Sequence, residues 1–163
     1  MKALLYIRKG SEASTGAICD SAICRQRDPF FVPDDRTWLG IPLVGVRIDR
    51  LGKNIRHNFA EKYYTDTVTA VHAYTEEAED TASRWARDCA LTVSDPGKKD
   101  DMAPEVKNLI DRMISVFSFS STLKTGDLIL VGLAENTFRI PKENTDINIE
   151  AADGFPPITF KVR

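Results

Sequence analysis

Apolar side chains recur with a period of two in several short segments of this chain, which predicts β-strands. In residues 42–48, Val44, Val46 and Ile48 alternate with other side chains, the pattern of a strand with two different faces. Residues 127–133 (DLILVGL) are apolar almost throughout, which is typical of a strand covered on both faces. Further strands or extended edges are expected at 2–7, 28–35, 67–74, 146–151 and 157–163. The Gly- and Ser-containing stretch after the first of these predicts a loop.

A period of three to four residues predicts helices elsewhere. The stripe is clearest over residues 103–119, where it is formed by Val106, Leu109, Ile110, Met113, Ile114 and Phe117. A second helix is expected over residues 55–63, with Asn54 as a possible N-cap. A third is expected over residues 76–89, because its acidic residues come first and its arginines last, the order that the helix dipole favours. The apolar face of this third helix is Ala78, Ala82, Trp85, Ala86 and Cys89.

Composition places the chain among globular proteins of one domain. Of its 163 residues, 42% are hydrophobic and 28% are charged, enough to build a core without repeats or low-complexity linkers. The predicted elements indicate the α+β class, as a single domain over residues 1–163. No apolar run approaches the roughly 20 residues of a membrane span. The first residues lack the apolar region of a signal peptide, so a cytoplasmic location is expected.

Charge and cysteine content exclude further classes of protein. A net charge of −2 without a basic patch argues against binding to nucleic acid or to an anionic membrane. Three cysteines without an export signal favour reduced thiols over a disulfide framework. Cys19 and Cys24 have no second pair or nearby histidine that would complete a zinc site.

The order of several short motifs resembles the fumarylacetoacetate hydrolase family. The resemblance covers residues 19–132, and the closing ITFKVR is similar to the family's last strand. The motifs are, in order, CDSAI, DPFFVPDD, VRIDRLGKNI, FAEKYY, AYT, a helix, and STLKTGDLILVG. The resemblance implies a mixed, strongly curved β-sheet, a β-roll, with a few packed helices.

The same resemblance implies a divalent cation, Mg²⁺ or Mn²⁺, and the residues that would hold it. In the family, two glutamates of an E-x-E strand and one aspartate bind the ion, which polarises a 1,3-dicarbonyl or oxo acid. Counting back from VRI, the E-x-E positions fall here on Ile41 and Leu43, and residues 36–48 contain no acid. The aspartate position falls on Ala78, so no metal ligand, catalytic residue or cofactor is predicted. Residual pocket candidates at the remaining motif positions are Thr75, Glu77, Cys89 and Leu133.

Other reactive side chains have simpler explanations. His57 and His72 match no motif and are more often surface or packed residues. The carboxylates of residues 76–80 suit the start of a helix. The serines and threonine of residues 118–122 lack a GxSxG elbow and a nearby histidine, which argues against a nucleophile.

These departures predict a pseudoenzyme of the family, without metal-dependent catalysis, that keeps the scaffold as a binding or assembly module. It is expected to form a homodimer or to pair with an intact family member, and to be shortened near the N-terminus and around residues 93–101. The alternative is an active metal-dependent hydrolase, isomerase or decarboxylase of a small oxo or 1,3-dicarbonyl acid. Its relocated ligands would be Asp34, Asp35, Glu77 and Glu79.

Overall fold

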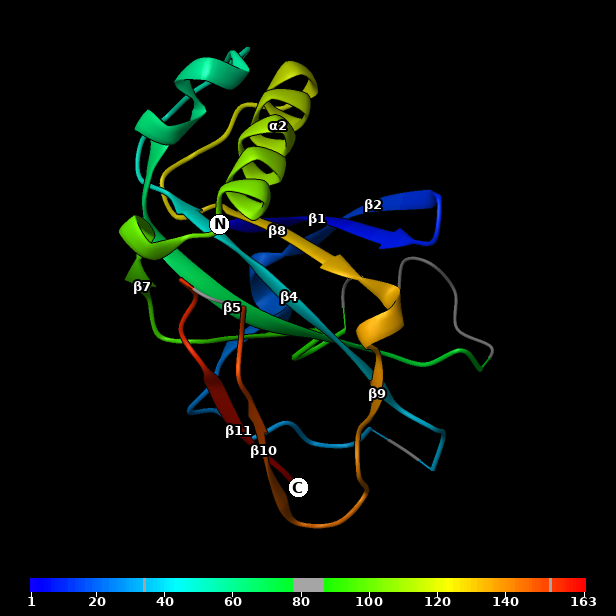
Figure 1. Ribbon diagram of the computed structural model, residues 1–163. Helices are drawn as coiled ribbons and strands as arrows, with labels where there is room; N and C mark the ends of the chain where they lie inside the picture. The colour runs from blue at the N-terminus through cyan, green and yellow to red at the C-terminus, as the bar shows by residue number, and fades with distance from the viewer. Residues whose placement is uncertain (34, 78–86, 153) are drawn as a thin grey trace.

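A strongly curled mixed sheet with one long helix packed on it forms the centre of the protein (Figure 1). The computed structural model describes residues 1–33, 35–77, 87–152 and 154–163. The strands of the sheet are β1 (Lys2–Lys9), β2 (Glu12–Cys19), β3 (Ile23–Arg25), β4 (Leu39–Ile48), β5 (Tyr64–Tyr74), β6 (Leu91–Val93), β7 (Gly97–Lys98), β8 (Leu128–Leu133) and β9 (Phe138–Arg139). The long helix is α2 (Pro104–Ser120), and a separate hairpin is formed by β10 (Thr145–Ile149) and β11 (Ile158–Val162). Short 3₁₀ turns are η1 (Asp20–Ala22), η2 (His57–Tyr63), η3 (Lys99–Asp101) and η4 (Ala134–Asn136).

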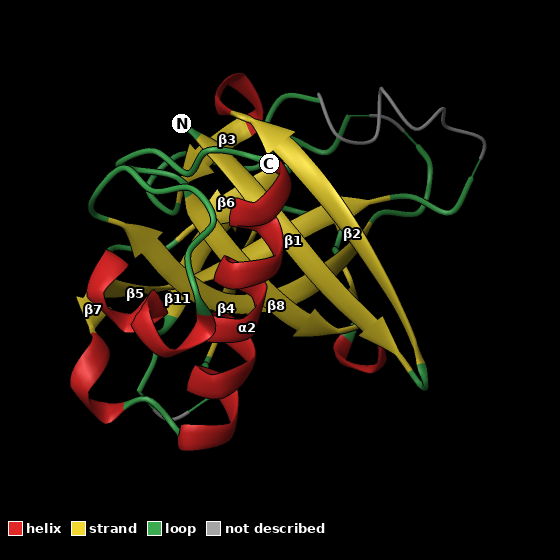
Figure 2. Ribbon diagram, turned by 90° about the horizontal axis from the view of Figure 1, so that it is seen from above, coloured by secondary structure: helices red, strands yellow, loops and turns green. Residues whose placement is uncertain are grey.

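The strand order of the sheet is β2-β1-β8-β4-β5-β6-β3, with β7 beside β5 and β9 beside β4. β8 therefore lies between β1, to which it is parallel, and β4, to which it is antiparallel. Gly45 makes the β4–β8 pairing possible, since a Cβ atom at this position would lie 1.9 Å from the carbonyl oxygen of Ile129. Seen from above, α2 lies across these central strands (Figure 2).

Alternation along the strands sends neighbouring residues into different cores. On one face, Leu5, Leu43 and Leu130 are buried inside the curl of the sheet. On the other face, α2 covers one part of β4 and β8, and the β10–β11 hairpin covers part of β5. The α2 core is built on Val46, Ile48, Ile110, Ile114 and Ile129, and the hairpin core on Val71, Ala73, Ile158, Phe160 and Val162. Two separate coverings thus share one face of the sheet.

The structure confirms the α+β class and the strongest patterns in the sequence. The stripe over residues 103–119 forms α2 almost to the residue, and the runs at 42–48, 67–74 and 127–133 are β4, β5 and β8. The expected extended segment near residue 30 pairs with β11, because Phe30 N–H donates to Lys161 O at 2.7 Å. The third expected helix includes residues 78–86, which lie outside the described part of the chain.

Two local predictions are wrong. The stretch after β1 is strand β2 and not a loop: its small residues bury little, but its backbone pairs with β1 along the whole strand. The helix expected over 55–63 is only the 3₁₀ turn η2, and Asn54 has a left-handed backbone (φ 54°) instead of capping it. The backbone N–H groups of Asn54 and Ile55 bond to Ser118, which holds this segment against α2 instead of in a helix.

The expectation of reduced thiols is also wrong for two of the three cysteines. Cys24 and Cys89 form a disulfide across 65 residues of sequence, and Cys19 is free and exposed. Parallel pairing of β3 with β6 places Cys24 opposite Thr92, close to the turn that carries Cys89. This proximity arises from sheet topology, which cysteine spacing alone cannot predict. Among the described helices, none is both long and apolar enough to cross a membrane.

Asp127 ties the first strand to the turn that precedes β8. Its side chain is almost fully buried and accepts hydrogen bonds from the backbone N–H of Lys2 (3.0 Å), the ammonium of Lys2 (2.8 Å) and the backbone N–H of Lys124 (2.9 Å). Burial alone would raise the pKa of this carboxyl, but these donors and the charge of Lys2 outweigh it and lower the pKa below 3.8.

We predict that Asp127→Asn lowers the free energy of unfolding at pH 7 by about 1.5–3 kcal/mol, because charge-assisted bonds in a buried site are lost. A lowered folded-state pKa stabilises the protein above the ordinary value of 3.8, and this contribution is lost as the pH falls through the folded-state pKa. The difference between variant and wild type should therefore shrink on acidification, as measured by urea unfolding.

The matched control is Asp95→Asn, which removes an ion pair with Arg27 between two exposed side chains. Such pairs contribute about 0–1 kcal/mol, so this variant should unfold nearly like the wild type. Equal losses in the two variants would contradict a special role for Asp127.

Candidate functional site

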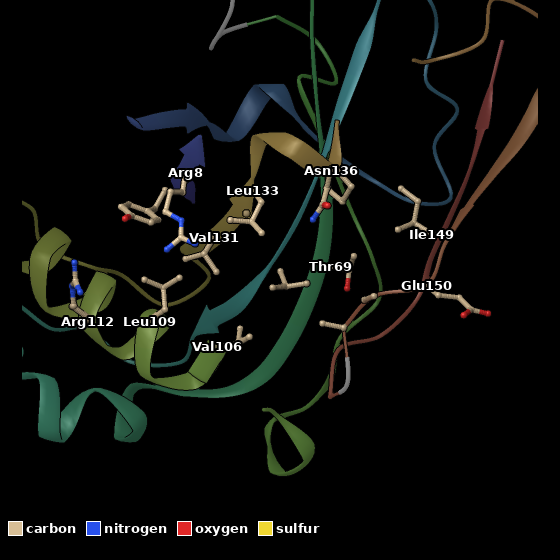
Figure 3. A pocket seen from close by; sticks show the side chains of 16 residues that line it. Arg8, Thr69, Val106, Leu109, Arg112, Val131, Leu133, Asn136, Ile149 and Glu150 are labelled. Atoms are coloured by element: carbon tan, nitrogen blue, oxygen red, sulfur yellow. The ribbon is translucent and has the colours of Figure 1, made fainter. Parts of the chain in front are cut away.

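A cavity of about 520 Å³ lies between α2, the sheet and the segment that follows β10 (Figure 3). It occupies the gap between the two coverings of the sheet face. Strand residues that line it are Tyr6, Arg8, Pro42, Val44, Thr69, Val131, Gly132 and Leu133. α2 contributes Val106, Leu109 and Arg112, and the remaining wall is formed by Asn136, Ile149, Glu150, Ala151 and Ala152.

The lining is mainly apolar, with few polar groups. Thr69 is already engaged, because its hydroxyl donates to the carbonyl oxygen of Pro156 at 2.5 Å. The ionisable side chains that remain are Tyr6, Arg8, Arg112 and Glu150. In Figure 3, Arg8 and Arg112 lie toward one end of the cavity, and Glu150 lies toward the other. The cavity can therefore enclose an apolar group and offer positive charge at one end.

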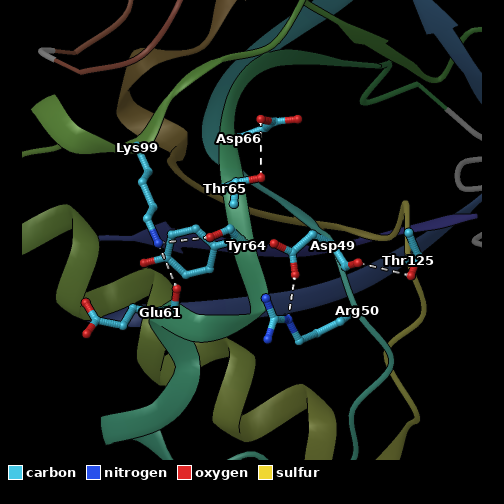
Figure 4. Close-up of polar contacts among 8 residues, drawn as sticks. All are labelled: Asp49, Arg50, Glu61, Tyr64, Thr65, Asp66, Lys99 and Thr125. Atoms are coloured by element: carbon cyan, nitrogen blue, oxygen red, sulfur yellow. Dashed lines mark hydrogen bonds and ion pairs between the residues drawn. The ribbon is translucent and has the colours of Figure 1, made fainter.

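The wall formed by α2 is held on the sheet by a buried polar contact. The hydroxyl of Tyr64 donates to Asp111 at 2.7 Å, and Lys107 donates to the other oxygen of this carboxylate at 2.8 Å. Burial, followed by the adjacent Asp111 carboxylate, raises the pKa of Tyr64 well above its ordinary range. Lys99 binds the start of β5, because its ammonium donates to the backbone carbonyl oxygens of Glu61 and Tyr64 at 3.0 and 3.2 Å (Figure 4).

Solved structures with this architecture come from several bacterial proteins. A fumarylpyruvate hydrolase from Pseudomonas aeruginosa, in complex with Mn²⁺ and pyruvate, superposes with a TM-score of 0.79 at 12% identity, covering 99% of this chain and 89% of that chain. A 2-hydroxyhepta-2,4-diene-1,7-dioate isomerase from Mycobacterium marinum superposes at 0.80 with 16% identity, covering 99% and 73%. A protein from Yersinia pestis CO92 assigned to the fumarylacetoacetate hydrolase family superposes at 0.76 with 15% identity, covering 99% and 92%.

The chain has the fumarylacetoacetate hydrolase fold. The resemblance of its motifs to that family is thus confirmed at the level of the fold. No protein-family model matches the sequence, and no curated protein matches it. The fold is therefore shared with proteins that are only 12%, 16% and 15% identical in sequence to this chain, and short framework motifs are the part of the sequence that indicates it.

Within the fumarylacetoacetate hydrolase fold of this chain, the two positions counted as E-x-E do not face the cavity. Ile41 and Leu43 are buried inside the curl of the sheet, 4% and 1% exposed. The residues of β4 that line the cavity are Pro42 and Val44. Neither face of the strand carries a carboxylate at this point. Ala78, the third counted position, lies outside the described residues.

Three of the four residual pocket candidates do not line the cavity. Leu133 lines the cavity, but Thr75 and Glu77 lie at the end of β5, where the Thr75 hydroxyl accepts a hydrogen bond from Glu77 N–H at 3.2 Å. The Glu77 carboxylate accepts from Thr37 N–H at 3.0 Å, and Cys89 is in the disulfide. Of the relocated ligands in the alternative hypothesis, Asp34 and Glu79 lie outside the described residues, while Asp35 and Glu77 do not line the cavity.

His72 and Ser118 have structural partners, and His57 lies on the surface. His72 is buried, and its Nδ1 lies 2.9 Å from the carbonyl oxygen of Ala90, whereas His57 is exposed on η2. Ser118 accepts from Ile55 N–H and donates to Ser115 O. In the part of the chain that the structure describes, no group of three or more His, Cys, Asp or Glu side chains is placed to hold a metal ion.

Arg8 and Arg112 line the cavity, but the sequence did not predict them as site residues. Arg8 directly follows a predicted strand, and Arg112 lies on the polar side of a predicted helix, so each has an ordinary local explanation. Arg8 and Arg112 are 104 residues apart in sequence and line the same cavity because α2 packs over β1 and β8, which no local pattern indicates.

We predict that Tyr64→Phe lowers the free energy of unfolding by about 1–3 kcal/mol, because the buried Asp111 loses a hydrogen-bond donor. The matched control is Tyr63→Phe. Tyr63 is half-buried at the end of η2, directly before Tyr64 in sequence, and its hydroxyl has no partner among the described residues, so its loss should cost little. Urea unfolding of both variants measures the difference, and equal stabilities would contradict the role of this contact.

Proposed function

We propose that this chain is a divergent member of the fumarylacetoacetate hydrolase family that binds a small organic molecule in the cavity without metal-dependent catalysis. The observation that carries this proposal is the lining of the cavity. Its sheet floor carries Pro42, Val44 and Val131, and among the described lining residues Glu150 is the one carboxylate. A volume of about 520 Å³ is within the usual range of small-molecule sites.

The donor set does not suit a divalent cation. Mg²⁺ and Mn²⁺ are held by several oxygen ligands, usually including more than one carboxylate. The related structure from P. aeruginosa contains Mn²⁺ and pyruvate, whereas the described lining of this cavity offers one exposed carboxylate and two guanidinium groups. Repulsion by Arg8 and Arg112 would oppose a cation further. Without a Lewis acid, the enolate charge of a 1,3-dicarbonyl substrate has no equivalent stabilisation here.

We predict that millimolar Mg²⁺ or Mn²⁺ leaves the melting temperature unchanged and that acetylpyruvate persists during incubation with the protein. A ligand that binds only the folded state must raise its stability, so melting curves with and without metal test for a site directly. A metal-dependent rise of several degrees, or hydrolysis that a chelator abolishes, would instead support the enzyme with relocated ligands.

We further propose that the protein assembles as a homodimer through β2. This strand is the edge of the sheet, pairs with β1 on one side, and exposes most of its side chains. Its single charged residue is Glu12, and it carries no lysine or proline of the kind that protects edge strands from pairing. An open edge of this kind can be covered by the same strand of a second copy.

We predict a dimer mass at micromolar concentration in light scattering. Thr15→Lys should shift the equilibrium toward monomer, because two lysines would meet across the paired edges. Thr65→Lys is the matched control, since it places the same substitution at an exposed strand position away from this edge. A monomer mass for the wild type, or equal behaviour of both variants, would rule out pairing through β2.

A further inference from the structure

Arg8 and Arg112 stand out among the residues that line the cavity. They come from different elements, β1 and α2, and both lie toward the same end of the cavity in Figure 3. Among the described residues, neither guanidinium takes part in an ion pair or hydrogen bond. Two arginines at one end of a mainly apolar cavity, with Glu150, the one acidic residue of the described lining, toward the other end, provide an electrostatic site for an anion.

Glu135 is an acidic residue whose charge interacts with that of Arg8, and it is engaged elsewhere. The Glu135 carboxylate accepts a short hydrogen bond of 2.6 Å from the backbone N–H of Gly10. That bond is the main reason that the pKa of Glu135 is lowered, and the charges of Arg8 and Lys9 add to it. Glu135 does not line the cavity, so the donors of Arg8 remain available to a ligand.

The remainder of the lining defines the body of the ligand. Leu109 and Val131 supply aliphatic surface next to the arginines. Val44 and Val106 extend the aliphatic lining of the cavity. Burying an apolar chain against such side chains is favourable by about 25 cal/mol per Å². Glu150 at the opposite end disfavours a second negative charge on the ligand. The ligand should therefore be amphipathic, with a single anionic group.

We propose that the cavity binds an amphipathic monocarboxylate, whose carboxylate is held by Arg8 and Arg112 and whose apolar chain lies on the strands and α2. This inference rests on the proposed function of the cavity as a small-molecule site. Guanidinium groups suit it because their planar array of donors matches the two oxygens of a carboxylate. The two arginine side chains bind the carboxylate directly. Repulsion by Glu150 lowers the affinity for a dicarboxylate relative to that for a monocarboxylate.

The test uses octanoate, octanedioate and octanol as probes of equal chain length. Isothermal titration calorimetry measures the three dissociation constants, and methyl NMR shifts of Val44 and Val131 report whether binding occurs in the cavity. We expect octanoate to bind about tenfold or more tightly than octanol, and more tightly than octanedioate. Octanoate affinity should fall with added salt, because the arginines are accessible to solvent.

The variants Arg8→Gln and Arg112→Gln should each weaken octanoate binding by about tenfold and leave octanol binding unchanged. Arg→Lys at either position should keep part of the affinity, since the charge remains but the paired donors are lost. The matched control is Arg50→Gln, which removes an exposed guanidinium that pairs with Asp49 outside the cavity. Arg8 and Arg112 are exposed and lie on separate elements, so neither substitution should disturb folding. Each variant therefore tests the site by itself.

The possible failures are distinguishable. If octanol binds as tightly as octanoate with shifts at Val44 and Val131, or if both glutamine variants keep full octanoate affinity, the monocarboxylate inference is overturned and the cavity remains a small-molecule site. If none of the three probes shifts the cavity methyl groups, the inference and the proposed binding function fail together.

Discussion

The close pairing of β8 with both β1 and β4 is the constraint on which the other features depend. Gly45 permits the approach, since any Cβ atom there would overlap the backbone of Ile129. Once the register is set, alternation assigns Leu43 and Leu130 to the interior of the curl and Val44 and Val131 to the face beneath α2. A shift of one residue would exchange these two sets, so the same contact determines the closed core and the floor of the cavity.

The cavity follows from how that second face is covered. α2 and the β10–β11 hairpin each cover part of it, and the cavity lies where the two coverings meet, over a strip of the sheet that α2 only partly covers. Pro42, Val44 and Val131 in this strip are apolar, and the positive groups approach from β1 and α2 at one end. The scaffold is shared with the Mn²⁺-containing structure of the P. aeruginosa hydrolase, whereas the strip of this chain is apolar and carries no carboxylate among Pro42, Val44 and Val131.

The comparison of Ile41 and Leu43 with Pro42 and Val44 illustrates a limit of motif counting. Counting along a strand identifies residues two apart, but which of the two sets faces a cavity depends on a register that differs by a single residue. The absence of acids over residues 36–48 is independent of that register, because it holds for both faces. The sequence therefore predicts that this strand carries no carboxylate on either face. Which of its residues line the cavity depends on the register, which the sequence does not show.

The sequence alone determined the elements whose patterns are local: α2 from its helical stripe, the strands β4, β5 and β8 from alternation and apolar runs, and the family fold from ordered motifs. Strand β2, the short η2 turn, the Cys24–Cys89 disulfide and the grouping of Arg8 with Arg112 were decided only by the tertiary structure. The physical reason is the range of the interactions. Side-chain periodicity acts over one or two turns, whereas strand pairing, disulfides and cavities join residues whose separation in sequence leaves no local trace.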